Sequence, residues 1–361
     1  MPQPTLYLAI TNHGFGHATR SAAIAAEIQR LCPEVVLILA TTAPRWLLEE
    51  SISGNFIHRP RAFDIGVVQS DSFTMDKPAT LVKLRELKAK QPSLIASEAS
   101  FLKQNQVDLV LADIPPLAAP IAHAAGIPCW MMSNFGWDLI YRAWGGEFIE
   151  MADWIAECFG QCDRLFRMPL HEPMAAFSSI TDVGFTGGTP RFSASEIEAK
   201  LTFTAPPEKR AILTFGGLGL NQVPYHNVQQ FPDWQFFTFD YDVPGDIPNL
   251  IHLTDRSLRP VDLMPFCHLI VSKPGYSTFS EACCQGISLI TTTREDFAEA
   301  PILIEAIQHY LPHRIISPQD LYSRHWEFLH QPLQPATDNR PIDKGGNRAI
   351  ATAVVDYLQS T

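Results

Sequence analysis

The stretch His13-Gly14-Phe15-Gly16-His17-Ala18-Thr19-Arg20 follows the first apolar run of the chain and leads into a helical pattern over residues 18–31. Glycines at such a point permit a tight turn and let a ligand approach the backbone closely. The start of a helix also offers free N–H groups and a partial positive charge. The stretch therefore predicts a strand–turn–helix unit that can hold an anion.

Two familiar motifs do not fit this turn. A dinucleotide-binding fingerprint needs a third glycine at position 19, which is Thr, and a phosphate-binding P-loop needs a lysine that is absent. His13 and His17 are four residues apart in what we predict to be a glycine turn, so we do not expect them to bind zinc. His17 faces the predicted ligand site, or it caps the helix.

The rest of the chain repeats the same rhythm of short apolar runs and helical patterns, which is typical of parallel sheets covered on both sides. The rhythm is interrupted by prolines and glycines between about 171 and 210, and we place a domain boundary near residue 186. Ser193 and Glu196 have the spacing of a capping box. The predicted strands are 6–10, 35–40, 109–112, 128–132, 210–215, 235–239, 269–271 and 288–292, and the predicted helices include 80–104, 137–159, 277–285, 301–310 and 347–358.

Glycine turns recur where the second half of the chain begins a new run of strands. Thr214-Phe215-Gly216-Gly217-Leu218-Gly219 follows one strand, and Lys273-Pro274-Gly275-Tyr276-Ser277-Thr278 follows another. The second turn opens a helix, where N–H groups and hydroxyls would suit a diphosphate. Glu281 lies one helical turn further on and could accept hydrogen bonds from ribose hydroxyls, unless it belongs to a solvated helix face. Read alone, the Gly216–Gly217 stretch is also compatible with a plain tight turn.

Asp113 ends the strand at 109–112, so we expect its carboxylate near the ligand crevice. If it contacts His17, it would select one imidazole tautomer and stabilise the cation that forms when His17 takes a proton. The alternative is that Asp113 caps the following helix.

Composition narrows the possible functions. The 361 residues carry 27 Lys and Arg against 38 Asp and Glu, a formal charge of −11 that argues against nucleic-acid binding. We expect no transmembrane segment and no secretory signal, since no apolar run reaches about 18 residues and the N-terminus lacks a basic region. The seven scattered cysteines indicate reduced thiols in a cytoplasmic protein.

Taken together, these motifs resemble the GT-B glycosyltransferases, and in particular the glycosyltransferase-like region of plant L-arabinokinases. The resemblance extends over nearly the whole chain. It is carried by residues 13–20, the strand end at 108–115, residues 133–141, Phe215-Gly216-Gly217, the loop 273–281, residues 294–301 and Gly345-Gly346. It implies an α/β architecture of two doubly wound, Rossmann-like domains that face a cleft, with domains at 1–186 and 187–340 and a C-terminal helix at 341–361 that returns to the N-terminal domain.

The resemblance also implies roles for individual residues. His17 falls on the catalytic base of inverting glycosyltransferases, Asp113 on its orienting acid and Glu281 on the ribose-binding acid. Asp296 and Glu299 lie where the family reads donor-sugar hydroxyls, although Phe297 replaces the usual Gln after Asp296. The expected donor-binding residues are Gly14, Gly16, Gly216, Gly217, Lys273, Gly275, Ser277, Thr278, Glu281, Asp296 and Glu299, and the expected acceptor pocket is formed by Asn134, Trp137, Asp138 and Tyr141.

The leading functional prediction is an inverting, metal-independent glycosyltransferase that needs no cofactor. Its partners would be a nucleotide-sugar donor, with a UDP sugar as the first candidate, and an unknown acceptor hydroxyl. The leaving diphosphate would be stabilised by a helix dipole and N–H groups. Two alternatives stay open: a nucleotide-sugar epimerase or hydrolase on the same fold, and a regulatory module that binds a nucleotide sugar without turnover.

Overall fold

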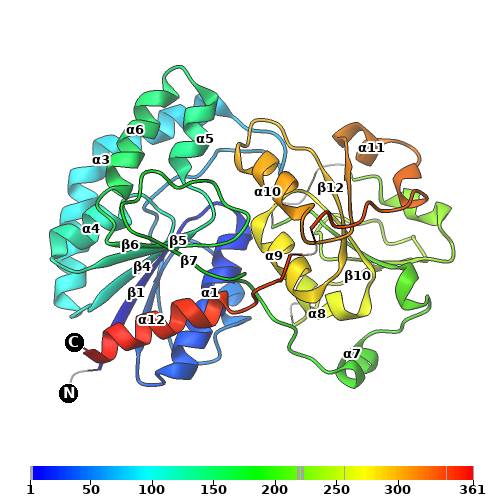
Figure 1. Cartoon of the computed structure of the whole chain (residues 1–361), viewed down its shortest axis with the longest axis horizontal. Coiled ribbons are helices and arrows are strands. Elements are labelled where there is room, and N and C mark those ends of the chain that lie inside the picture. The colour runs from blue at the N-terminus through cyan, green and yellow to red at the C-terminus, as the bar shows by residue number, and fades with distance from the viewer. Residues whose placement is uncertain (1–2, 218–219, 221–222, 256, 339, 361) are drawn as a thin grey trace.

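Two parallel β-sheets organise the computed structural model, which describes residues 3–217, 220, 223–255, 257–338 and 340–360 (Figure 1). Each sheet belongs to a separate half of the chain and is covered by helices on both faces. The predicted architecture of two doubly wound domains is confirmed. The strand ends of both halves point toward the space between them, which is where such sheets bind ligands.

The first sheet has the strand order β3-β2-β1-β4-β5-β6-β7, and all its strands are parallel. Every residue of β1 is buried, because helices cover both faces of the sheet. A continuous apolar run is stable in such a strand. The strands are β1 (Thr5–Ile10), β2 (Val36–Ala40), β3 (Ile57–Arg59), β4 (Leu109–Asp113), β5 (Cys129–Ser133), β6 (Arg164–Arg167) and β7 (Ile180–Asp182). The helices are α1 (Gly14–Leu31), α2 (Arg45–Glu49), α3 (Lys77–Gln104), α4 (Ala118–Ala125), α5 (Trp137–Trp144) and α6 (Phe148–Phe159).

The second sheet has the order β10-β9-β8-β11-β12-β13 and is again parallel throughout. Its strands are β8 (Arg210–Thr214), β9 (Gln235–Thr238), β10 (Leu250–His252), β11 (Leu269–Ser272), β12 (Ser288–Thr292) and β13 (His313–Ile316). The helices are α7 (Ala194–Lys200), α8 (Pro260–Leu263), α9 (Tyr276–Gln285), α10 (Glu299–Ile307), α11 (Pro318–Tyr322) and α12 (Gly346–Ser360). Short 3₁₀ helices lie at Pro207–Lys209, Tyr225–Gln230, Met264–Phe266 and Glu327–Leu329.

Two helix predictions are corrected by the structure. The single helix predicted at 137–159 is two helices, α5 and α6, because Gly145 and Gly146 both have a positive φ and break the chain direction between them. Helix α1 begins at Gly14 rather than at residue 18, so His17 lies inside its first turns and does not cap it. The predicted capping box is confirmed: Ser193 accepts from the Glu196 N–H, and the Glu196 carboxylate accepts from the Ser193 N–H at 2.8 Å.

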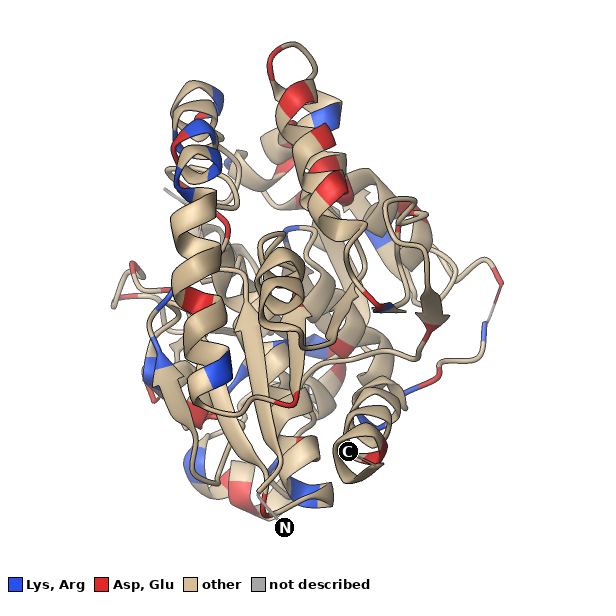
Figure 2. Ribbon diagram, turned by 90° about the vertical axis from the view of Figure 1, so that its left-hand side faces the viewer, with Lys and Arg blue, Asp and Glu red and all other residues tan. Residues whose placement is uncertain are grey.

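Helix α12 carries the end of the chain back to the first sheet. It packs against α1 through Ile350, Val354 and Leu358, and Tyr357 contacts the Trp130 ring with a centroid distance of 5.3 Å. Figures 1 and 2 both show the two ends of the chain close together at this end of the molecule. Figure 2 shows both basic and acidic residues on the face turned to the viewer. Lys88 of α3 and Glu150 of α6 form an ion pair at 2.9 Å.

None of the described helices combines the length and apolarity that a bilayer-spanning segment requires. All seven cysteines are free, and five of them are buried. The apolar core is divided by the sheets into clusters. One of them runs from the α1 face of the first sheet through α12 to α8 and α9, and so joins the two halves of the chain.

Candidate functional site

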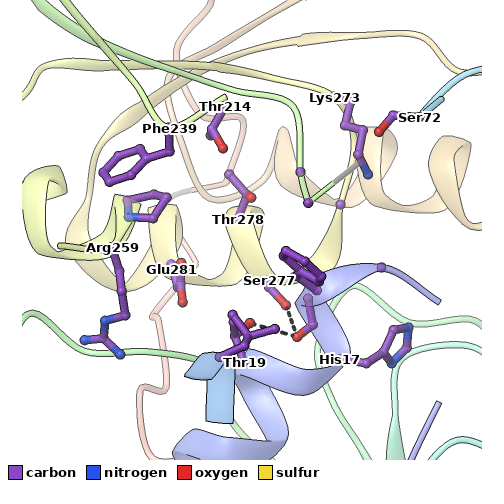
Figure 3. A pocket seen from close by; sticks show the side chains of 18 of the residues that line it. His17, Thr19, Ser72, Thr214, Phe239, Arg259, Lys273, Ser277, Thr278 and Glu281 are labelled. Atoms are coloured by element: carbon purple, nitrogen blue, oxygen red, sulfur yellow. Dashed lines mark hydrogen bonds between the residues drawn. The ribbon is translucent and has the colours of Figure 1, made fainter. Parts of the chain in front are cut away.

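A cavity of about 490 Å³ lies between the two domains (Figure 3). One side is formed by the start of α1 and by loops of the first domain. The other side is formed by the ends of β8, β9 and β11 and by the start of α9. Of the residues predicted from sequence, those that line the cavity are Gly14, Gly16, His17, Gly216, Gly217, Lys273, Gly275, Ser277, Thr278, Glu281 and Glu299.

His17 reaches the cavity from the second turn of α1 and is held from behind by Asp113. Its Nδ1 lies 2.9 Å from Asp113 Oδ1. Asp113 is fully buried at the end of β4, where it pairs in register with Ile10 at the end of β1. Helix α4 begins only at Ala118, with Leu117 as its N-cap, so Asp113 is not a helix cap. The two residues that the sequence placed 96 positions apart are therefore in direct contact.

Arg20, which the sequence analysis did not assign, is a third member of this group. It lies one turn beyond His17 on α1, and its Nε donates to Asp113 Oδ2 at 2.6 Å. Its Nη2 donates to Asp113 Oδ1, and the Ser21 hydroxyl donates to Oδ2 at 2.9 Å. Burial opposes ionisation of Asp113, but Arg20 and His17 outweigh it and hold the pKa of this carboxyl well below its usual range.

These contacts select one tautomer of His17. Nδ1 lies 2.9 Å from both Asp113 Oδ1 and Arg20 Nη2. A proton on Nδ1 can be donated to the carboxylate, whereas an unprotonated Nδ1 would place two acceptors against each other. Arg20 Nη2 has the carboxylate and Ser133 Oγ to donate to instead. We therefore assign the proton to Nδ1, which leaves Nε2 as the acceptor.

A hydrogen-bonded bridge leads from this group to the second domain. Arg20 Nη1 donates to Asn134 Oδ1 at 3.1 Å, and Asn134 Nδ2 donates to Glu299 Oε1 at 2.7 Å. Glu299 opens α10 and lines the cavity. The bridge thus joins Glu299 of the second domain to Arg20 and Asp113 of the first, through residues that are all buried.

The four residues predicted to form an acceptor pocket do not line this cavity. The side chain of Asn134 is hydrogen-bonded to Arg20 and Glu299 in the bridge. Trp137 is only 1% exposed and stacks on Tyr141 at a centroid distance of 6.2 Å. The Tyr141 hydroxyl donates to the Gly66 carbonyl, and Asp138 opens α5 behind the cavity wall. The first-domain side chains that do line the cavity outside α1 include Trp46, Leu47, Gln69, Ser72 and Phe135.

Asp296 is also outside the cavity, unlike its neighbour Glu299. Its side chain is 55% exposed and pairs with Lys77 of α3 at 2.6 Å. Phe297 turns inward instead, with its ring stacked on His13 at a centroid distance of 5.6 Å. The apolar side chain, not the carboxylate, therefore faces the place where the donor sugar was expected.

The loop before α9 brings a lysine and several backbone donors to the cavity. Gly275 is the N-cap of α9, and Ser277 and Thr278 occupy its first turn. Burial lowers the pKa of Lys273 to about 7, the neighbouring charge of Arg294 adds to this, and Glu299 opposes it. Lys273 forms no ion pair with a described carboxylate. Its ammonium lies beside the two glycine turns: a Cβ at Gly216 or Gly275 would be 3.5 or 3.7 Å from Nζ. An amine and the N–H groups at the start of α9 are therefore brought to one part of the cavity wall.

Gly16 and Gly217 allow the two domains to approach each other closely. A Cβ at Gly217 would lie 2.4 Å from the Phe15 ring, and a Cβ at Gly16 would lie 3.0 Å from Ser277 Oγ. Ser277 Oγ also donates to the Gly16 carbonyl at 2.9 Å (Figure 3). The predicted turn positions Leu218 and Gly219 lie outside the described residues.

Glu281 lines the cavity one turn into α9 and is not part of a solvated face. Its Oε1 accepts from the Gly188 N–H at 2.9 Å, in the segment that joins the domains. Burial raises the pKa of Glu281 to about 7, against the effect of that hydrogen bond and of the nearby Arg259. Figure 3 shows Arg259 and Glu281 on the same side of the cavity, away from His17. No group of three or more His, Cys, Asp or Glu within the described residues could hold a metal ion.

Sequence reasoning missed Arg20, Phe15 and Arg294, all of which line the cavity. The spacing of His17 and Arg20, three apart on one helix, was a usable signal for a shared partner. Phe15 and Arg294 carried no comparable signal, because their roles depend on the opposite domain.

We compared the sequence and the structure with those of known proteins. No protein-family model matches the chain. It is 28% identical over 347 residues to L-arabinokinase of Arabidopsis thaliana, a match that covers 93% of this chain and 32% of that protein. The chain therefore spans about a third of the length of this relative.

Solved structures agree over the full length. The calicheamicin glycosyltransferase CalG4 matches with a TM-score of 0.68 and 16% identity, covering 99% of both chains. A UDP-glucosyltransferase from Polygonum tinctorium matches with a TM-score of 0.65 and 12% identity, covering 100% of both chains. The two facing parallel sheets, the cavity between them and these matches together show that the chain has the GT-B fold of glycosyltransferases.

Proposed function

We propose that the protein is a glycosyltransferase that moves a sugar from a nucleoside diphosphate sugar to an acceptor hydroxyl, with His17 as the general base. The observation that carries the proposal is the contact of His17 with the buried carboxylate of Asp113 at 2.9 Å in the wall of the interdomain cavity. This contact leaves Nε2 free to take a proton. A sugar hydroxyl is a poor nucleophile at neutral pH, so a base of this kind lowers the barrier.

The donor side of the proposal rests on the second domain. The N–H groups at the start of α9, together with Lys273, form a cationic patch that suits a diphosphate. Glu281 lies further along α9, at a distance along the helix that suits a ribose. The nucleotide is then held by one domain and the base by the other, and the anomeric carbon lies between them. UDP is the first nucleotide to test, because the Polygonum relative is a UDP-glucosyltransferase.

The mechanism that we propose for this arrangement is inverting. His17 removes the proton of the acceptor hydroxyl, whose oxygen attacks the anomeric carbon from the side opposite the diphosphate. The bond to the diphosphate oxygen breaks, and the negative charge on the leaving group is stabilised by Lys273 and the positive end of α9. The proposed reaction is metal-independent, because these protein groups supply the positive charge at the leaving group.

The test has two stages. Calorimetry first establishes which nucleoside diphosphate binds, and a sugar-transfer or donor-hydrolysis assay is then run with the matching nucleotide sugar. His17→Ala should lower turnover by about 10²–10⁴-fold and leave donor affinity nearly unchanged. Asp113→Asn should give a smaller loss of the same kind. His123→Ala, an exposed histidine on α4, is the control and should behave like the wild type. Normal transfer by His17→Ala would exclude this mechanism.

A second candidate is binding of a nucleotide sugar without turnover. The observation that favours it is the double contact of Arg20 with Asp113, which neutralises much of the carboxylate charge that would otherwise support a cationic His17. Tight binding of a nucleotide sugar combined with neither transfer nor hydrolysis, in wild type and His17→Ala alike, would support this reading over catalysis.

A further inference from the structure

Arg294 is a buried cation whose hydrogen-bonding groups are not satisfied by the protein. It lies in the loop after β12, is 8% exposed, and lines the interdomain cavity. Its Nε has no hydrogen-bond partner, and its one hydrogen bond within the described residues is long, 3.4 Å from Nη2 to Gln69 Oε1. It forms no ion pair with a carboxylate in the described part of the chain. A buried guanidinium in this state calls for an anionic partner.

The neighbouring acid does not supply that partner. Glu299 favours the charged form of Arg294, but its Oε1 accepts from Asn134 at 2.7 Å. Burial, opposed by Glu299 and by Asp71, lowers the pKa of Arg294 to about 10, so the side chain stays charged at neutral pH. His13 on the opposite side is kept neutral, since burial and the nearby cations lower its pKa. Arg294 and Lys273 are therefore neighbouring cations in the cavity wall, and neither forms an ion pair with a carboxylate within the described residues.

Aromatic rings connect Arg294 to the proposed base. The Arg294 guanidinium carbon lies 4.0 Å from the centroid of the Phe297 ring. That ring contacts Phe135 at 6.1 Å, and Phe135 contacts His17 at 5.9 Å between centroids. Lys273 and the start of α9 lie on the other side, at the glycine turns. Arg294 thus lines the same cavity as Lys273 and His17, the cavity in which the donor sugar would be bound.

Resting on the proposed function, we infer that the donor sugar carries a carboxylate, as a hexuronic acid does, and that Arg294 binds it. One face of the guanidinium lies against the Phe297 ring and its Nε is buried, so the two Nη groups are the part of its edge that remains for a ligand. The edge of a guanidinium presents N–H groups in a planar fork that matches the two oxygens of a carboxylate. The diphosphate has partners of its own in Lys273 and the N–H groups of α9.

Arg294 would distinguish donors with a neutral hexose from donors with a uronic acid. A neutral hexose would leave Arg294 buried and unpaired in the complex, which disfavours binding. A uronic acid would pair with it and with Gln69 beside it. Arg294, rather than the solvent-exposed Asp296 two residues later in the same loop, would therefore contact the donor sugar.

Calorimetry with UDP, UDP-glucose and UDP-glucuronic acid tests this on the full chain. The wild type should bind UDP-glucuronic acid about 10- to 100-fold more tightly than UDP-glucose, the range expected for a charge-assisted hydrogen bond. Arg294→Gln should abolish that preference while its affinity for UDP stays within about twofold. Glu295→Gln, which changes the exposed neighbour, should keep the preference. If the wild type binds GDP rather than UDP, the pair GDP-mannose and GDP-mannuronic acid replaces the uridine pair.

Other results overturn the inference in distinguishable ways. Equal affinity for the two sugars in the wild type would show that the sugar is not acidic. An Arg294→Gln variant that loses UDP affinity as strongly as it loses nucleotide-sugar affinity would make Arg294 a diphosphate ligand. If no nucleoside diphosphate bound the wild type, the proposed function itself would fail, and this inference with it.

Discussion

Replacing Lys273 by methionine should stabilise the free protein and weaken its binding of nucleoside diphosphates. The ammonium is buried beside Arg294 without an ion-pair partner among the described residues, and its pKa falls from 10.5 to about 7. At about 1.4 kcal/mol per tenfold change in proton affinity, this fall corresponds to at most about 5 kcal/mol against the charged form. Lys273 keeps partial exposure to solvent in the cavity, so we expect a realised gain of about 1–2 kcal/mol for Lys273→Met.

The dependence on pH has a definite sign. Because the folded-state pKa lies below that of the unfolded chain, the unfolded chain binds the proton more tightly. The destabilisation by Lys273 is therefore fully present below about pH 7, and it diminishes as the pH rises from about 7 toward 10.5. The stability difference between Lys273→Met and the wild type should shrink over the same range.

Urea denaturation at about pH 6.5 and about pH 9 measures this difference, with Lys103→Met as the control. Lys103 is exposed at the end of α3, and its replacement should change the free energy of unfolding by less than about 0.5 kcal/mol. Calorimetry on the same variants should show the loss of nucleoside diphosphate affinity in Lys273→Met alone. A Lys273→Met variant that is less stable than the wild type at pH 6.5, or a difference that does not change with pH, would refute the reasoning.

Three further substitutions test the site. Arg20→Met should lower the free energy of unfolding by about 3–5 kcal/mol in urea denaturation, because it leaves the buried charge of Asp113 without Arg20. A loss no larger than that caused by Arg348→Met, which replaces an exposed arginine, would speak against the pairing. Gly217→Ala should weaken nucleoside diphosphate binding in calorimetry, since its Cβ would lie 2.4 Å from the Phe15 ring, and the added change Phe15→Ala should restore it if the clash is the cause. Asp296→Ala should leave donor affinity within about twofold, since its carboxylate pairs with Lys77 outside the cavity, whereas a tenfold loss would return Asp296 to the donor site.

Much of the fold was predictable because its signals are local. The apolar run of β1 must be covered on both faces, and the glycines after it allow the chain to turn at once into α1. The same pattern recurs at β8 and β11, so two similar halves could be recognised. The short strands β3, β6, β7, β10 and β13 were not predicted. They lie toward the edges of the sheets, and several carry polar residues such as His58 and Arg164, so they lack a continuous apolar run.

The candidate site was predictable only where a residue follows directly from the end of a strand or the start of a helix. His17, Asp113 and Lys273 could be placed in this way, since parallel strands in one sheet end at the same edge. Trp137 and Tyr141 belong to the core, because their rings pack against each other and Tyr141 also stacks on Phe148. An aromatic residue after a strand end looks the same in sequence whether it faces a ligand or the interior.

The sequence by itself determined the two sheets, the glycine turns at their strand ends and the presence of a histidine and an acid near one cleft. Only the tertiary structure decided that Arg20 shares Asp113 with His17 and that Asn134 links this group to Glu299. It also decided that the buried Nε of Arg294 has no hydrogen-bond partner within the described residues. The physical reason is the separation in sequence between the residues that interact. Turn and strand formation depend on residues a few positions apart, whereas the balance of buried charges depends on which side chains the two domains bring together across the cleft.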